Sequence, residues 1–356
     1  MRPNAASVVT HEGNLTGEKI RFTLDENSLA HLHSVLSDLY SDREMAVLRE
    51  LSTNAYDAQL ENNYDGPVEV TLPSALTPTL TITDHGVGMT LDDLYNIYTK
   101  YGASTKRESD VYTGMLGIGS KAPLALVDSF TVITVKDTVK IVAMLTKFEE
   151  GIGELTIVDT SVTDDPSGTT ISIPVSEYNA LAPKAEALFR FWEPGTVTVN
   201  GAQPQHVSGE QLSDDTILSF DLSKDYVVMG NVPYPVEIPD EEHRSWDTYN
   251  ISSMGRSYNV GYGVVVRVPM GSVHFTPNRE ALNYTPATVN YLNERKSAFK
   301  ELLNSYLAST MESLTSRSEA LQTHYMWKQK LSYYAEIPSR WHDEQILDRF
   351  TFNHWE

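Results

Sequence analysis

The sequence predicts an α+β protein in which helices cover one face of a mixed, mostly antiparallel sheet, followed by a second α+β domain and a helical tail. Three patterns support this prediction. Residues 42–61 have the apolar spacing of an amphipathic helix. Residues 68–83 and 130–174 contain short segments in which apolar and polar side chains alternate, as they do in half-buried strands. Helical spacing returns from residue 286 onward, so the sheets and helices are expected to pack in layers.

The first domain, residues 1–180, is expected to open with a polar arm of about twenty residues. A strand at 20–24 and a helix at 27–40 follow, and Asp42 is a suitable N-cap for the helix that ends near residue 61. Residues 101–113 are polar and contain glycine, which is the composition of a mobile lid. The remaining expected elements are strands at 68–72, 79–83, 130–135, 139–145, 154–159 and 169–174, and short helical runs at 91–98 and 122–127.

A change of composition around residues 174–183 places the first domain boundary at residue 180. The second domain, 181–285, contains several short strands, and Asn200-Gly201 is typical of a hairpin turn. The third segment, 286–356, opens with Thr285 as the N-cap and a proline at the first helical position. Three tryptophans are expected to anchor its packing: Trp327, Trp341 and Trp355.

The composition is that of a globular protein: 356 residues, of which 40% are apolar and 21% are charged. No apolar run approaches the ~20 residues that cross a bilayer, and the first residues lack an apolar signal core, so we expect no membrane span. The absence of cysteine excludes disulfides and thiolate metal sites and fits a reducing cytoplasm. A net charge of −21 with no basic cluster argues against nucleic acid as a partner.

The helix at 42–61 carries three polar side chains with suitable chemistry for nucleotide hydrolysis. Glu50, Asn54 and Asp57 are four and three residues apart, so they share one face of the helix, beside a neighbouring apolar face. Together they can supply a general base, a ligand for a hard cation and an orienting group. Such a face is most often merely solvated, so this motif alone decides nothing.

Three further motifs follow in the sequence. They are Asp84-His85-Gly86-Val87-Gly88-Met89 at a strand end, a glycine-rich stretch at 114–121, and a turn entering a strand at 167–173. Each is weak by itself, because Asp-x-Gly-x-Gly is usually a turn and a lone glycine-rich loop is common. Four such elements in this order and spacing are not expected by chance.

In these four motifs the chain resembles the GHKL ATPases, the superfamily that includes Hsp90, DNA gyrase B, MutL and histidine kinases. The resemblance implies a Bergerat-type ATP-binding layer, with ATP and Mg²⁺ as cofactors. Residues 39–42 together with 49–58, and residues 97–106 and 116–123, are also similar to phage RIIA-like proteins. That similarity implies a bacteriophage protein in the host cytoplasm, although RIIA proteins of large phages are longer.

The resemblance also implies a role for each polar side chain. Glu50 would be the general base that activates water for attack on the γ-phosphate. Asn54 would bind Mg²⁺ through its amide oxygen, which suffices because this ion takes its other ligands from phosphates and water. Asp84 would accept a hydrogen bond from the adenine amine, and Thr169 would help to hold a water beside the base. Asp57 would support the nucleotide site without touching the nucleotide.

The glycine motifs are expected to bring the backbone close to the nucleotide. Gly86 and Gly88 allow a close approach to the base and ribose, and Met89 fills an apolar position beside them. The N–H groups of the later loop can cradle phosphates, and its lysine adds a positive charge. The expected phosphate-binding residues are Gly114, Leu116, Gly117, Ile118, Gly119, Ser120 and Lys121.

One segment of the second domain also resembles a GHKL motif. Residues 275–282 are similar to the Ser-Arg-Glu-x-Leu segment of the Hsp90 middle domain, with Asn278 in place of the serine. This similarity implies that Arg279 reaches the γ-phosphate, so that ATP would clamp the two domains together and hydrolysis would release them. An Arg–Glu pair at the start of a surface helix is the alternative.

Two functions follow from the sequence. The first is Mg²⁺-dependent ATP hydrolysis that drives lid closure and a domain rearrangement or, by family analogy, formation of a homodimer. The second is an ATP-binding regulator with negligible turnover that acts by binding and inhibiting a host or phage target protein.

Overall fold

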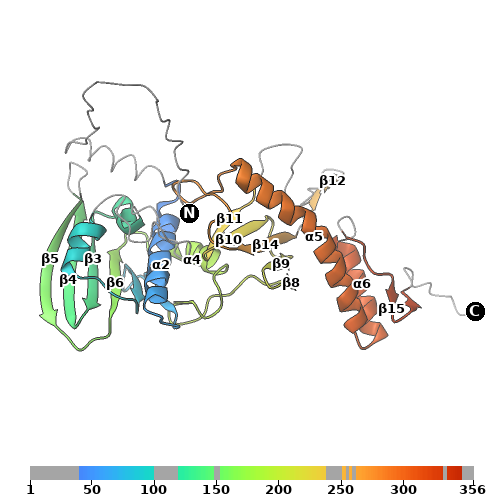
Figure 1. Ribbon diagram of the computed structural model, residues 1–356, viewed down its shortest axis with the longest axis horizontal. Helices are drawn as coiled ribbons and strands as arrows, with labels where there is room; N and C mark the ends of the chain where they lie inside the picture. Colours follow the sequence, from blue (N-terminus) through green and yellow to red (C-terminus); the bar gives the residue numbers. More distant parts are fainter. Residues whose placement is uncertain are drawn as a thin grey trace, which may run out of the picture.

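The computed structural model describes residues 40–99, 119–147, 153–237, 262–331 and 335–346, together with the backbone of residues 251–253 and 256–258. The expected arm, strand and helix before residue 40, the expected lid at 101–113 and Trp355 lie outside the described residues. The described elements pack around two sheets that lie one after the other along the longest axis of the molecule (Figure 1).

The first sheet has seven strands in the order β5-β4-β3-β6-β2-β1-β7, and every pairing is antiparallel except the one between β1 and β7. Leu80, Ile82 and Asp84 alternate with less buried threonines along β2, so these three side chains point to the same face. The strands are β1 (Val68–Thr71), β2 (Thr79–Asp84), β3 (Ser129–Lys136), β4 (Val139–Lys147), β5 (Gly153–Val162), β6 (Gly168–Pro174) and β7 (Val197–Val199).

Helices cover one face of this sheet, as the sequence predicts. The main one, α2 (Arg43–Glu61), begins at Asp42, whose carboxylate accepts a hydrogen bond from the Met45 N–H at 3.0 Å, which confirms the predicted N-cap. Leu48 and Leu51 are almost fully buried against the sheet, and burial of each stabilises the fold by about 1.5–3 kcal/mol. The other helices of this unit are α3 (Leu91–Asp93), the π-helix η1 (Leu94–Tyr98), the 3₁₀-helix η2 (Gly119–Ala125) and α4 (Leu181–Phe189).

The run predicted as helical at 122–127 forms the 3₁₀-helix η2 and begins earlier than expected. Pro123 lies inside it, and a proline has no N–H to donate to an α-helical ladder. The short η2 packs on α2 through Ala122 and Leu124, which belong to the same buried cluster as Leu51.

Helix α4 and strand β7 pack with the first sheet, although the sequence assigns both to the second domain. Leu181, Leu188 and Phe189 of α4 are buried in the cluster that contains Leu51, and β7 pairs in parallel with β1. Because a composition change cannot report which sheet an element joins, the predicted boundary at residue 180 precedes the end of this packed unit. The division into independently folding domains stays a prediction.

The second sheet has five strands in the order β11-β10-β14-β9-β8, with only β10 and β14 parallel. Its long helix α5 (Pro286–Ser313) starts at the predicted cap Thr285, which accepts from the Thr288 N–H, and has the predicted proline at its first position. The strands are β8 (Glu210–Ser213), β9 (Thr216–Ser219), β10 (Tyr226–Met229), β11 (Val232–Pro235) and β14 (Gly263–Val268).

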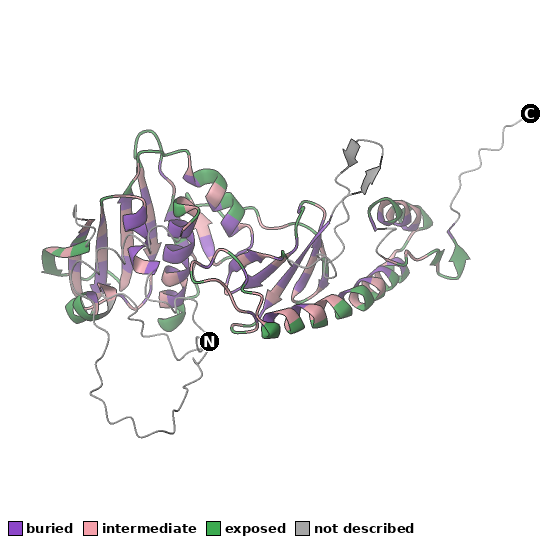
Figure 2. Cartoon of the chain, turned by 90° about the horizontal axis from the view of Figure 1, so that it is seen from above, coloured by how far each residue is buried: buried purple, intermediate pink, exposed green. Residues whose placement is uncertain are grey.

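The helical tail packs on this second sheet. Leu292 and Leu303 of α5 and Trp327 of α6 (Arg317–Leu331) are buried in one cluster with Val227 and Val264 of the sheet. Figure 2 shows the buried side of α5 turned toward the sheet and its exposed side turned away. Trp327 is therefore a packing anchor, as predicted, and Trp341 packs at the edge of the same cluster.

Short hairpins complete the described chain: β12 (Ile251–Ser253) with β13 (Arg256–Tyr258), and β15 (Arg340–Trp341) with β16 (Glu344–Gln345). Asn200 and Gly201 both have positive φ, as the predicted tight turn requires, but β7 pairs with β1 and makes only one bridge across that turn. Among the described helices, none is both long and apolar enough to cross a membrane.

Candidate functional site

One face of α2 is bordered by two glycine segments. Glu50, Asn54 and Ala58 are successive i, i+4 positions, so they form a row along the helix. A Cβ on Gly119 would lie 2.6 Å from Glu50 Oε2, and a Cβ on Gly86 would lie 2.5 Å from Ala58 Cβ. At Gly86 the close atoms are the Cβ and backbone of Ala58, so glycine is required there, whereas a side chain at Gly119 would force the end of the Glu50 side chain to shift. The half-buried Asn54 lies between the two contacts.

A row of polar side chains crosses the sheet on the side covered by the helices. Asp84, Thr169 and Thr134 are neighbours in register on β2, β6 and β3, and all three are buried. The Thr169 N–H donates to Asp84 Oδ1 at 3.2 Å, and the two threonine hydroxyls are 3.1 Å apart. The structure therefore brings the predicted Asp84 and Thr169 together and adds Thr134, which looks like an ordinary strand residue in the sequence.

The turn after β2 is fixed by its glycines and by this row. Asp84 Oδ1 also accepts from the Gly86 N–H at 2.8 Å, and the Met89 N–H donates to the Thr134 hydroxyl at 2.9 Å. Gly88 has φ +63°, and a Cβ there would lie 2.0 Å from the Val135 carbonyl oxygen. The carboxylate at the strand end thus holds the backbone that leads into the glycine turn.

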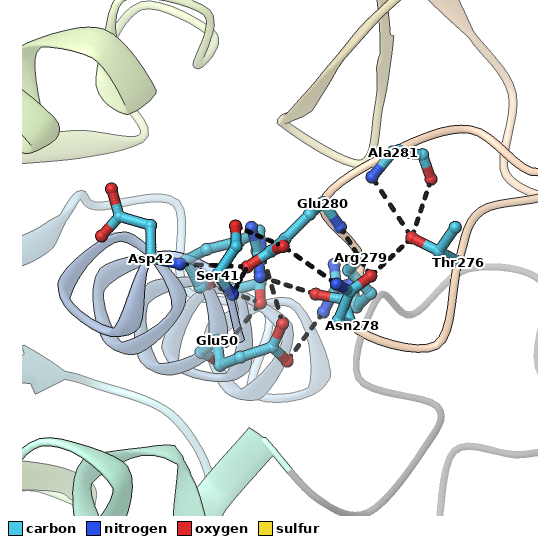
Figure 3. A network of polar contacts seen from close by, with 10 residues as sticks. Ser41, Asp42, Glu50, Thr276, Asn278, Arg279, Glu280 and Ala281 are labelled. Atoms are coloured by element: carbon cyan, nitrogen blue, oxygen red, sulfur yellow. Dashed lines mark hydrogen bonds and ion pairs between the residues drawn. The ribbon is translucent and has the colours of Figure 1, made fainter. Parts of the chain in front are cut away.

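The second unit, which is built on the five-stranded sheet, contributes Arg279 to this site. Its Nη1 donates to Glu50 Oε2 at 3.1 Å, and both side chains are almost fully buried (Figure 3). Arg49 donates from Nε to the other carboxylate oxygen of Glu50 at 3.3 Å. The carboxylate predicted to be the general base therefore lies between two guanidinium groups, one from each unit.

The guanidinium of Arg279 is buried beside two aromatic rings. Its Cζ is 5.8 Å from the centre of the Phe275 ring, which stacks with Tyr234 of β11. Burial lowers the pKa of Arg279, but Glu50, Tyr234 and Asp57 outweigh this effect and hold it above its usual value. Arg279 also hydrogen-bonds with the side chain of Tyr234. A buried guanidinium that keeps its positive charge can bind an anionic ligand.

Helix α2 and the loop at 275–282 are joined at two further points. Arg49 Nη2 donates to the Asn278 carbonyl at 2.7 Å. Glu280 accepts from the backbone N–H and the hydroxyl of Ser41 at 3.0 and 2.8 Å, and from the Asp42 N–H at 3.5 Å. Arg49, Glu280 and Ser41 have no role predicted from the sequence, because the contacts join residues far apart in the chain.

The loop predicted to bind phosphate is described only at its end. Gly119 and Ser120 open η2, and Lys121 is buried beside Tyr98, with Nζ 5.9 Å from the ring centre. Burial lowers the pKa of Lys121 to about 8. The other predicted members of the loop, Gly114, Leu116, Gly117 and Ile118, lie outside the described residues.

Asp57 is fully buried, and its charge helps to hold the pKa of Arg279 above its usual value. Its supporting role stays a prediction. The described residues contain no group of three or more His, Asp or Glu side chains arranged to hold a metal ion. The amide oxygen of Asn54 beside Glu50 is a suitable ligand for Mg²⁺ only if phosphate and water complete the coordination, which is the usual arrangement for this ion.

A family model and several curated proteins match parts of this chain. Residues 40–165 match the family model of histidine kinase-, DNA gyrase B-, and HSP90-like ATPases. The chain is 29% identical to the chaperone protein HtpG of Cupriavidus necator over 45% of this chain and 28% of that protein. It is 28% identical to HtpG of Yersinia pestis (strain Pestoides F) over 58% of this chain and 40% of that protein. The chain thus spans less than half of the length of these curated relatives.

Among solved structures, the chain is similar to the ATPase region of Saccharomyces cerevisiae topoisomerase II bound to ICRF-187 (dexrazoxane). The sequence identity is 11% and the TM-score is 0.49, over 73% of this chain and 84% of that chain.

Proposed function

We propose that this protein is a GHKL ATPase that binds ATP and Mg²⁺ along helix α2 and hydrolyses the nucleotide with Glu50 as the general base. The observation that carries the proposal is the order of groups along that helix. Gly119 meets the helix at Glu50, Gly86 meets it at Ala58, and Asn54 lies midway. With a rise of 1.5 Å per residue, the two ends of this row are about 12 Å apart.

This order fits an extended nucleotide. The base would lie at the Gly86 end, where Asp84 has a carboxylate oxygen that can accept from the adenine amine. The phosphates would lie at the Gly119 end, where η2 begins and the buried Lys121 adds a positive charge. The family match over residues 40–165 supports the same assignment, because all of these groups belong to it.

Asn54 would hold Mg²⁺ between these two ends. The ion would neutralise phosphate charge and polarise the bond to the γ-phosphate. Glu50 would accept a proton from the attacking water, and its burial would keep competing bulk water away from the carboxylate.

Arg279 would stabilise the γ-phosphate from the second unit. Its position beside Glu50 and its raised pKa suit an anionic ligand. To reach phosphate, the guanidinium would share or leave its contact with Glu50, so ATP binding and the arrangement of the two units would be coupled. ATP-driven formation of a homodimer belongs to the same proposal by analogy with the family.

The second candidate is an ATP-binding regulator with negligible turnover, which acts by binding a host or phage target protein. The observation that favours it is the pairing of Glu50 with two arginines, because the two guanidinium groups occupy both carboxylate oxygens that would have to accept a proton from water. The RIIA-like, bacteriophage part of the proposal rests on the sequence segments alone and applies to both candidates.

Calorimetric titration tests nucleotide binding. Wild type should bind ATP and ADP, and Asp84→Asn should lose affinity about tenfold or more. The amide would either present its NH₂ donor to the adenine amine or no longer accept the hydrogen bond from the Gly86 N–H. Unchanged affinity in Asp84→Asn would remove the adenine assignment.

Phosphate release then separates the two candidates. Glu50→Ala should abolish turnover while ATP still binds if the protein is an ATPase. If wild type binds ATP but releases no phosphate above the Glu50→Ala background, the regulator is the correct candidate.

A further inference from the structure

We infer that Glu280 is a positioning residue: its carboxylate binds Ser41 and Asp42 at the start of helix α2 and thereby positions Arg279 against Glu50. The inference rests on the proposed function of Glu50 and Arg279, and it concerns a residue that neither the family match nor the sequence motifs give a role. Figure 3 shows Glu280 between the loop of the second unit and the first turn of the helix.

The contacts of Glu280 are concentrated on one short stretch of the first unit. Oε1 accepts from the backbone N–H groups of Ser41 and Asp42, and Oε2 accepts from the Ser41 hydroxyl. These N–H groups stand at the N-terminal end of α2, where the helix dipole favours a negative charge. A carboxylate satisfies both donors of Ser41 at once, whereas an amide has one accepting oxygen.

Glu280 and Arg279 hold α2 at two separate places. Glu280 binds at residues 41 and 42, and Arg279 binds at Glu50, eight residues beyond Asp42. Eight residues of helix span about 12 Å, so the two contacts define the direction of the helix relative to the loop. A single contact would leave the helix free to pivot about it.

The loop that carries both residues is internally braced. The Arg279 N–H donates to the Thr276 carbonyl at 2.8 Å, the Thr276 N–H donates to the Ala281 carbonyl at 2.9 Å, and Asn278 Nδ2 donates to Glu280 Oε2 at 2.9 Å. Arg279 has φ +57°, a left-handed conformation that L-residues seldom adopt and that persists only where its surroundings impose it. Because the loop is stiff, a displacement of Glu280 moves Arg279 as well.

Kinetics of Glu280→Gln test the inference. We expect kcat for ATP hydrolysis to fall about tenfold, while the Kd for a non-hydrolysable ATP analogue changes less than about twofold, because Glu280 does not border the nucleotide face of α2. In an Arg279→Ala background the same substitution should have no further effect, since its action passes through Arg279. Glu301→Gln, the same change at an exposed position of α5, is the matched control and should behave as wild type.

A second measurement does not depend on activity. The chain has no cysteine, so spin labels can be placed at Leu76→Cys in the first unit and Ser318→Cys in the second, both exposed positions. The distance distribution between them should be narrow in wild type and in Glu301→Gln, and clearly broader or shifted in Glu280→Gln. Ser41→Ala, which removes only the hydroxyl contact, should give a smaller change in the same direction. It replaces Glu280→Gln in this measurement if that variant folds poorly.

The outcomes distinguish the positioning role from the hydrolysis proposal. If wild type releases no phosphate, the hydrolysis proposal fails and the distance measurement alone decides the role of Glu280. If the distances are unchanged in Glu280→Gln, or if its loss of kcat persists in full in the Arg279→Ala background, the positioning role is wrong.

Discussion

Arg279 Nη1 lies 3.1 Å from Glu50 Oε2, although the two residues are 229 positions apart and belong to units built on different sheets. This ion pair is buried, and Arg49 contributes a second positive charge to the same carboxylate. The residue expected to activate water and the residue expected to contact the γ-phosphate are therefore direct partners. Nucleotide binding and the contact between the two units are expected to depend on the same few atoms.

Breaking this pair should destabilise the protein strongly. Arg279→Ala leaves a buried carboxylate with one partner fewer, and removing one partner of a buried pair typically costs about 3–5 kcal/mol. Denaturant unfolding followed by circular dichroism would measure the loss.

The matched control is Arg317→Ala, which removes an arginine from the exposed pair with Glu344 and should leave the free energy of unfolding essentially unchanged. Equal losses in Arg279→Ala and Arg317→Ala would show that the buried contact contributes nothing.

Lys121 should make the stability depend on pH in an unusual direction. Burial lowers its pKa to about 8 from an unfolded value near 10.5, so between these values the unfolded chain binds more protons at this residue. Below pH 8 the charged Lys121 therefore lowers the free energy of unfolding by its full amount. This loss of stability becomes smaller as the pH rises toward 10. Lys121→Met should be more stable than wild type at pH 7 by roughly 2–4 kcal/mol, with a difference that shrinks by pH 10.

Unfolding free energies of both proteins at pH 7, 8, 9 and 10 would test this. The series stops at pH 10 because burial raises the pKa of Tyr98, whose ionisation in the unfolded chain then lowers stability. A difference between Lys121→Met and wild type that stays constant with pH would contradict the prediction.

Gly88→Ala should destabilise the first unit more than Gly271→Ala does the second. Both glycines have positive φ, +63° and +85°, so both substitutions have a conformational cost of about 1 kcal/mol. At Gly88 the new Cβ would also lie 2.0 Å from the Val135 carbonyl oxygen, whereas nothing lies within 4 Å at Gly271. The difference between the thermal unfolding midpoints of the two variants measures the cost of the clash with Val135, apart from the conformational cost that both share. The prediction fails if both midpoints fall equally.

A fragment of residues 1–206 should fold cooperatively, whereas one of residues 1–180 should not. The shorter fragment lacks α4 and β7, and with them the buried Phe189 and Trp192 of the first cluster. Each large apolar side chain lost from a core removes about 1.5–3 kcal/mol. Thermal unfolding followed by circular dichroism would compare the two fragments, and a sharp transition in the shorter one would support the predicted boundary at residue 180.

Local patterns predicted most of the elements correctly. Helix α2 begins after the predicted cap at Asp42, and β2 ends at Asp84, because caps and alternation depend on residues a few positions apart. Asp84 and Thr169 are neighbours in the sheet, and their roles at an adenine base stay a prediction. The parallel pairing of β7 with β1 was not predictable, since parallel neighbours are joined by long connections that leave no local signal.

The sequence by itself determined which chemical groups this protein carries and in which order, because spacing along a helix or a strand already decides which side chains share a face. Glu50 and Asn54 share a face of α2 for that reason. Only the tertiary structure decided that Glu50 contacts Arg279 and that Glu280 contacts Ser41. Those contacts depend on how two sheets and a braced loop pack against one helix, and packing joins residues whose separation along the chain contains no information about their distance in space.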